Sequence, residues 1–319
     1  MRSSRLGVLF LLAIGVIAST NCSYYNRVMS RKDLVDGSVA YRERKFAEAE
    51  ALFRKAAARD PQSTEGKTAQ VFLARTLHSQ YIGNRQNPAL AENAIAEYKK
   101  ALALNPNDQS SYKAIASLFE NLQKTDDWQK WVTERSANSA IEPQFRAEAL
   151  TALAAKQNTC ANEISDTDAT KKKAKDKDGK DIFQFVKPAD AAEFDKFKGC
   201  VSTGEELIGK AMALEPDSVK NAKSLNLKSL TDEQLKSNND VIKIFESARS
   251  YRASLTIQAM RLAEMEGRTA DRDRLKAEGD AFRSQYSELS EVVRNIQTEV
   301  DTRRAASDAA ASTNANAKK

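Results

Sequence analysis

The feature that most constrains the fold is a pattern of small residues, one aromatic residue and a proline within residues 37–61. Two antiparallel helices cross closely only where their side chains are small, and Gly37, Ala49 and Ala56 provide such places. Phe53 stands at helical spacing from both alanines and fills the space between the helices. Proline cannot continue a helix, so Pro61 resets the chain after the second helix. The segment therefore predicts a helical hairpin.

The same pattern recurs at the same offsets in residues 94–106 and 204–216. A degenerate copy ends at Pro143, with Trp128 and Trp131 where its second helix is expected to begin. The alternative is a non-repetitive helical domain with chance alanine spacing, which three copies in register argue against. The signature positions are Gly37, Ala49, Phe53, Ala56, Pro61, Ala94, Tyr98, Ala101, Pro106, Gly204, Ile208, Ala211 and Pro216.

This pattern resembles the tetratricopeptide repeat family. The resemblance implies an all-α fold, a helical-hairpin solenoid whose first helices line a concave, peptide-binding groove. On this resemblance the groove residues are Arg31, Tyr41, Arg42, Arg75, His78, Lys113, Glu120 and Asn121. The Lys and Asn clamp that some members use for a terminal carboxylate would fall on Leu34 and Ser38, so that binding mode is not expected.

A lysine-rich insertion at about 165–188 interrupts the predicted solenoid over residues 31–220. Its charge predicts a solvated loop. The apolar run 182–186 at its end is expected to pack back onto the solenoid, and a lid over the groove is the alternative. A calcium loop is not expected, because with Gly179 as the turn glycine the first and twelfth ligand positions are Ala174 and Phe185.

Residues 221–304 predict a long C-terminal helical hairpin, with helices at about 240–266 and 269–304 and Gly267 at the cap between them. The second helix carries an apolar stripe at heptad spacing: Phe282, Tyr286, Leu289, Val293, Ile296 and Val300. We expect the stripe to fold back on its partner helix, and a homodimeric coiled coil through residues 282–300 is the alternative. Residues 305–319 lack apolar periodicity and are expected to form a disordered tail.

Residues 1–21 have the pattern of a signal peptide, with Arg2 and Arg5 before an apolar run over residues 6–18. Cys22 follows and resembles the lipid-modified cysteine of bacterial lipoproteins, with residues 22–30 as a linker. Ser19 and Asn21 depart from the usual signal, so ordinary cleavage after Ala18 stays open. The expected location is the outer membrane, or another periplasm-facing membrane, through a lipid anchor, and the alternative is a soluble periplasmic protein.

The chain has three cysteines. If Cys22 carries lipid, Cys160 and Cys200 remain as a pair in a compartment that permits disulfides. They flank the lysine-rich insertion, at helix ends that antiparallel packing brings together. We expect a disulfide between them, and two buried free thiols are the alternative.

Composition argues against several functions. A single histidine, His78, excludes a multi-histidine metal site, and no Gly-rich phosphate loop is present, so we expect no catalytic residue, metal or cofactor. The net charge of +6 is spread along the chain, which does not favour nucleic-acid binding.

The predicted function is a protein-binding scaffold of the bacterial cell envelope. The alternative is an assembly factor, similar to the repeat lipoproteins that serve outer-membrane β-barrel insertion or pilus secretin assembly.

Overall fold

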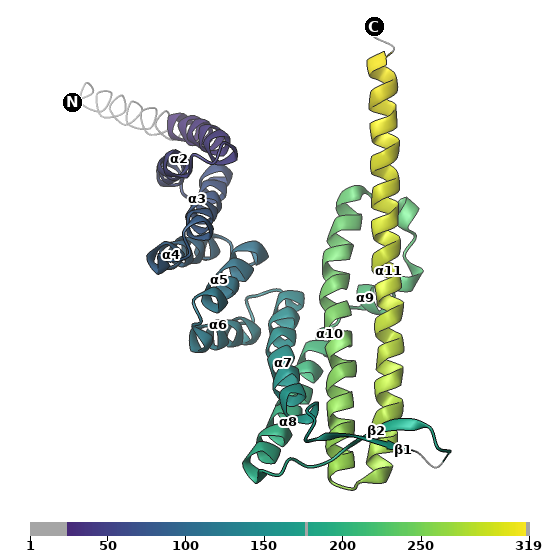
Figure 1. The fold of residues 1–319 in the computed structure, drawn as a ribbon. Coiled ribbons are helices and arrows are strands. Elements are labelled where there is room, and N and C mark those ends of the chain that lie inside the picture. Colours follow the sequence, from purple (N-terminus) through teal and green to yellow (C-terminus); the bar gives the residue numbers. More distant parts are fainter. Residues whose placement is uncertain (1–23, 176–177, 317–319) are drawn as a thin grey trace, which may run out of the picture. The chain divides into compact units, whose positions relative to one another are not determined.

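A computed structural model describes residues 24–175 and 178–316, with side chains up to residue 310 (Figure 1). The predicted signal peptide and Cys22 lie outside the described residues. The elements in chain order are a helix over 24–42, α2 (Phe46–Arg59), α3 (Thr64–Gly83), α4 (Pro88–Leu104), α5 (Gln109–Asn121), α6 (Thr125–Ala137), α7 (Pro143–Ser165), β1 (Lys171–Lys175), β2 (Asp181–Phe185), α8 (Ala191–Met212), α9 (Asp217–Lys220), η1 (Ala222–Ser224), η2 (Leu227–Ser229), α10 (Asp232–Met265) and α11 (Thr269–Asn316). The predicted class, an all-α solenoid of helical hairpins, is confirmed.

The chain divides into two compact units, residues 1–128 and 129–319, with the boundary inside α6. The predicted solenoid over 31–220 therefore extends across both units. Within the described residues, no helix has the length and apolar character needed to cross a membrane.

The first unit stacks similar helical hairpins on one another. The first helices of the first two pairs, 24–42 and α3, run side by side in the same direction. Arg27 Nε lies 3.6 Å from Glu65 Oε2 near their starts, and Tyr41 Oη lies 2.9 Å from Ser79 Oγ near their ends. Both contacts join residues 38 positions apart. This regular offset is the geometry of a stacked repeat.

The signature residues take the structural roles that their spacing predicts. Ala49, Phe53 and Ala56 are fully buried, and a Cβ atom placed on Gly37 would lie 2.8 Å from the Phe53 ring. The two helices therefore cross as closely as glycine allows. Pro61 is exposed and lies outside α2.

Turns of one type close three of the helical hairpins. Arg44, Gln123 and Gly267 have φ values of 62°, 56° and 77°, in the left-handed region. In each turn the next residue donates its N–H to the carbonyl five residues back, at 2.9, 2.9 and 2.8 Å. This is the Schellman arrangement, which confirms the predicted role of Gly267.

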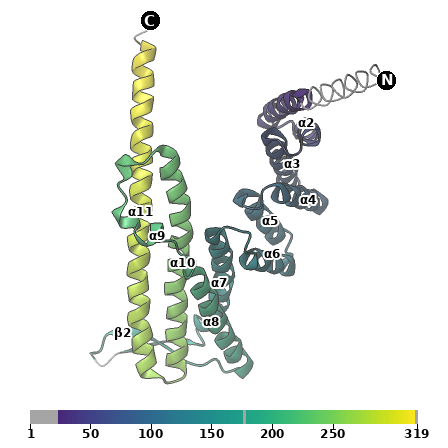
Figure 2. The same cartoon turned by 180° about the vertical axis from the view of Figure 1, so that it is seen from behind.

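The second unit packs α7, α8, α10 and α11 around a shared core. A Cβ on Gly204 of α8 would lie 2.5 Å from Leu255 of α10, so these helices also touch at a small residue. α11 lies along α10 (Figure 2). Leu289 and Ile296 of its predicted stripe are buried in the shared core. The stripe thus packs against helices of its own chain.

Several predicted boundaries are wrong. Residues 24–30 belong to the first helix and do not form a linker. α10 begins at Asp232 because Thr231 and Gln234 form a capping box. α11 continues to Asn316, so residues 305–316 are helical where we expected disorder, and their many alanines favour helix without any apolar periodicity.

The lysine-rich insertion was also mispredicted. It contains an antiparallel β-hairpin in which Lys171 pairs with Phe185 and Lys175 with Asp181. Phe185 is buried in the core formed with α7, α8 and α10, whereas Ile182 and Phe183 remain exposed. Of the apolar run 182–186, only the C-terminal end therefore packs back onto the helices.

The predicted disulfide is present. Cys160 of α7 and Cys200 of α8 are bonded, and their Cα atoms lie 6.1 Å apart. This separation is within the range that a disulfide spans. The bond closes the insertion at its base.

Candidate protein-binding surface

The predicted groove residues lie on the first helices of three successive pairs. Arg31, Tyr41 and Arg42 are on helix 24–42, Arg75 and His78 on α3, and Lys113, Glu120 and Asn121 on α5. The structure brings some of them together and separates others. Arg31 is about three helical turns from Arg42.

The C-terminal ends of helix 24–42 and α3 enclose a pocket of about 530 Å³, which we call the Tyr41 pocket. Its lining residues are Tyr41, Arg42, Arg44, Phe46, Ser79, Ile82 and Gly83. Ile82 is 56% exposed, which is unusual for a large aliphatic side chain. Two arginines and an exposed apolar surface thus share one pocket.

Aromatic contacts hold the wall of the Tyr41 pocket in place. The Tyr41 ring meets Phe46 edge-on at 5.6 Å and Phe72 at 6.3 Å, measured between ring centroids. Phe72 in turn stacks on the buried Phe53 at 5.4 Å. Because this chain of rings ends in the core, the pocket wall is preorganised before any partner arrives.

A second pocket of about 300 Å³ lies beside Arg75 and includes Lys67, Val71, Phe72 and Ser110 in its lining. The Arg75 guanidinium carbon lies 5.3 Å from the centroid of the Phe72 ring. Arg75 also donates a hydrogen bond from Nη2 to Ser110 Oγ at 3.2 Å. The stacking and the hydrogen bond fix the direction of this positive charge.

The other predicted groove residues have different surroundings. His78 is half-buried, and its Nδ1 lies 3.4 Å from Tyr98 Oη of α4, so its ring belongs to the packing of the α3–α4 pair. Asn121 Oδ1 accepts a hydrogen bond from Arg85 Nη1 at 3.3 Å. Lys113 and Glu120 are exposed on α5, outside the linings of both pockets.

His78 makes the stability of the first unit depend on pH. Burial lowers the pKa of His78, and the nearby charge of Arg85 lowers it further. The unfolded chain therefore binds a proton more readily, and stability should fall as pH drops through about 6.5, the usual pKa of histidine. His78→Phe keeps a ring against Tyr98 and removes the titration. Denaturant unfolding between pH 7.5 and 5.5 should show a flatter pH dependence for this variant, and equal slopes would contradict the assignment.

Sequence reasoning missed an apolar stripe on the first helix. Tyr24, Val28, Val35 and Val39 are all exposed. Their spacings of 4, 7 and 4 place them on one helical face, opposite the face that packs on α2 and α3. Arg31 and Arg42 share this face by the same spacing rule. The periodicity was readable in the sequence, but residues 22–30 were interpreted as a linker.

Comparison with known proteins gives limited information. No protein-family model matches the chain, and no curated protein matches it. A structural match is the PilF protein of Pseudomonas aeruginosa, at 15% sequence identity and a TM-score of 0.31, covering 83% of this chain and 97% of that one.

Proposed function

We propose that the first unit binds a protein segment that carries an apolar side chain next to acidic ones. The observation that supports this most directly is the Tyr41 pocket, where the exposed Ile82 lies in the same lining as Arg42 and Arg44. Its volume is within the roughly 300–1,000 Å³ usual for binding sites. An apolar side chain of the partner enters the pocket, and neighbouring carboxylates meet the two guanidinium groups.

The charges around the pockets favour an acidic partner. Arg42 and Arg44 line the Tyr41 pocket, and Arg75 lines the second pocket. Arg75 is held by Phe72 and Ser110, so it loses little conformational freedom on binding. Such charges speed association and make it sensitive to salt.

The proposal includes a place for the protein in the cell envelope. We infer export from the signal-like residues 1–21 and lipid attachment at Cys22 from its position after the apolar run. The lipid would place the first unit near a membrane. Mass spectrometry of the mature N-terminus tests this part, and an unmodified cysteine would contradict it.

Reversing two of these charges should weaken partner binding. Arg42→Glu with Arg75→Glu is expected to reduce affinity by about tenfold or more, because both pockets then repel carboxylates. The measurement is fluorescence anisotropy with peptides that place one leucine or phenylalanine among glutamates. Peptides with glutamine in place of glutamate should bind the wild-type chain less tightly.

A matched control distinguishes an effect of the binding site on affinity from an effect of the net charge. Lys55→Glu with Lys99→Glu makes the same change in charge on α2 and α4, the second helices of their pairs, and should leave peptide affinity unchanged. Circular dichroism checks that all variants stay folded. Equal binding by both double variants would show that the two pockets are not the site. Cross-linking in the cell envelope tests the alternative function, that of an assembly factor. A cross-link to a barrel-insertase or secretin subunit would identify the protein as such a factor.

A further inference from the structure

The β-hairpin of the second unit combines positive charge with exposed apolar side chains. Among its described residues, 171–175 and 178–187, are six lysines and two aspartates. Ile182 is 40% and Phe183 is 52% exposed. Neither feature contributes to the binding surface of the first unit, and the charge and the apolar surface occur together.

The strand register shows how these side chains are arranged. Paired residues point to the same side of a hairpin, and successive residues along a strand point to opposite sides. Lys171, Lys173, Phe183 and Phe185 therefore share one face, and Lys172 and Ile182 share the other. Lys171 Nζ lies 4.6 Å from the centroid of the Phe183 ring. One face thus has a lysine against an aromatic ring, and the other carries both a lysine and an aliphatic side chain, with Lys172 Nζ donating to the Asp168 carbonyl at 2.7 Å.

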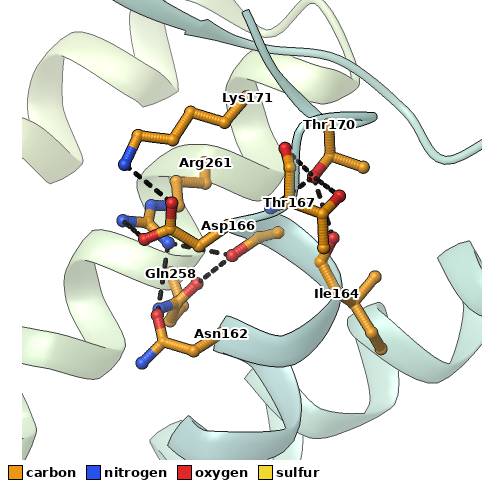
Figure 3. A network of polar contacts seen from close by, with 9 residues as sticks. Asn162, Ile164, Asp166, Thr167, Thr170, Lys171, Gln258 and Arg261 are labelled. Atoms are coloured by element: carbon orange, nitrogen blue, oxygen red, sulfur yellow. Dashed lines mark hydrogen bonds and ion pairs between the residues drawn. The ribbon is translucent and has the colours of Figure 1, made fainter.

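One end of the hairpin is fixed to the helices. Phe185 is buried, with the Arg261 guanidinium 4.5 Å from the centroid of its ring. Asp166 accepts from Lys171 Nζ at 2.7 Å and lies 3.5 Å from Arg261 Nη2 (Figure 3). The Lys171 hydrogen bond, together with the nearby Arg261 charge, lowers the pKa of Asp166, so this carboxylate stays charged at neutral pH.

Further hydrogen bonds connect the fixed end of the hairpin to α7 and α10. Thr170 Oγ1 donates to the Ile164 carbonyl at 2.9 Å (Figure 3). Arg261 Nη1 donates to Ser165 Oγ, also at 2.9 Å. Ser165 Oγ donates to Gln258 Oε1, also at 2.9 Å. These hydrogen bonds fix the base of the two strands, from which Ile182 and Phe183 are exposed.

We propose that the exposed lysines of the two strands, together with Ile182 and Phe183, dock on an anionic lipid surface. Lysine ammonium groups are attracted by lipid phosphates, and their long apolar stems can lie along the acyl boundary. Phe183 and Ile182 enter the interface, which explains why large apolar side chains remain exposed beside so many charges. A highly charged partner such as nucleic acid would match the lysines and leave Ile182 without a favourable contact. This inference is independent of the peptide-binding function of the first unit.

The test uses the chain from residue 23 onward, which retains every described residue and carries no lipid. It should sediment with phosphatidylcholine vesicles that contain phosphatidylglycerol and not with pure phosphatidylcholine vesicles, and high salt should release it. Lys172→Glu with Lys173→Glu should weaken binding at least about tenfold. Phe183→Ser should weaken it at unchanged charge.

Two controls decide between the outcomes. Lys236→Glu with Lys243→Glu makes the same charge change at exposed positions of α10 and should bind as the unaltered chain does. Poly-glutamate and a single-stranded oligonucleotide are tested as competitors. Absence of vesicle binding, equal loss in the control variant, or preference for either competitor over the vesicles would overturn the proposal. An intact Cys160–Cys200 bond in each variant shows that α7 and α8 are still joined below the hairpin.

Discussion

Replacing Phe53 with alanine should lower the free energy of unfolding of the first unit by roughly 3–5 kcal/mol. Phe53 is 0% exposed, stacks on Phe72 and contacts Gly37 at the closest crossing of the first helical hairpin. Glycine at that crossing cannot extend into the space that the ring leaves. The lost stability therefore includes both the transfer free energy of the buried ring and the cost of the cavity that it leaves.

Hydrogen exchange followed by peptide mass spectrometry across a denaturant series is the suitable measurement, because it reports each unit separately. Peptides from residues 24–128 should lose protection early, and peptides from 129–316 should not change. Phe183→Ala is the matched control, since the same substitution at an exposed ring should change stability by less than about 0.5 kcal/mol. An equally small effect at Phe53 would contradict the assigned core.

Removing the disulfide should destabilise the second unit by roughly 2–4 kcal/mol. Cys160 and Cys200 are 40 residues apart in sequence, so the bond restricts a long loop in the unfolded chain. In Cys160→Ala with Cys200→Ala, the α7–α8 pair must close that loop by packing alone. The measurement is the same exchange experiment, followed in peptides of α7 and α8.

A reducing agent provides the control for this prediction. It should destabilise the unaltered chain by a similar amount and have no effect on the double variant. Titration of the native chain should find neither the Cys160 nor the Cys200 thiol free. Two free thiols in the folded protein, or a stability unaffected by reduction, would favour the alternative of two buried cysteines.

The repeats could be predicted because their signal is local and steric. Gly37, Ala49, Phe53 and Ala56 are constrained by one close crossing, and the spacing of these residues follows directly from helix geometry. The disulfide could be predicted for a similar reason, since it depends on antiparallel pairing of adjacent helices. These features involve few residues and short distances along the chain.

The β-hairpin could not be predicted in this way. Lysine has a low preference for strands, and nothing in residues 171–175 alternates between apolar and polar. The hairpin depends on Phe185 in the core and on contacts of Asp166 and Thr170 with distant helices. Such tertiary contacts override local preference, and a single sequence does not reveal them.

The proposed binding surface shares some residues with the groove expected from the sequence. The resemblance placed Tyr41, Arg42 and Arg75 on the first helices, and the structure adds Arg44 and Ile82 to the same surroundings. Arg44 escaped notice because it occupies a left-handed turn, a position normally associated with glycine or asparagine. His78 was placed on the surface, but its ring turns toward Tyr98 because α3 and α4 pack closely there.

The bond between Cys160 and Cys200 also affects how this protein can evolve. It joins α7 to α8 whatever lies between them, and the cost of closing a flexible loop rises by only about 0.6 kcal/mol for each doubling of its length. Substitutions, insertions or deletions beyond the anchored base would therefore have little influence on the helices below. Selection could change the hairpin for a new surface while the rest of the second unit stays intact.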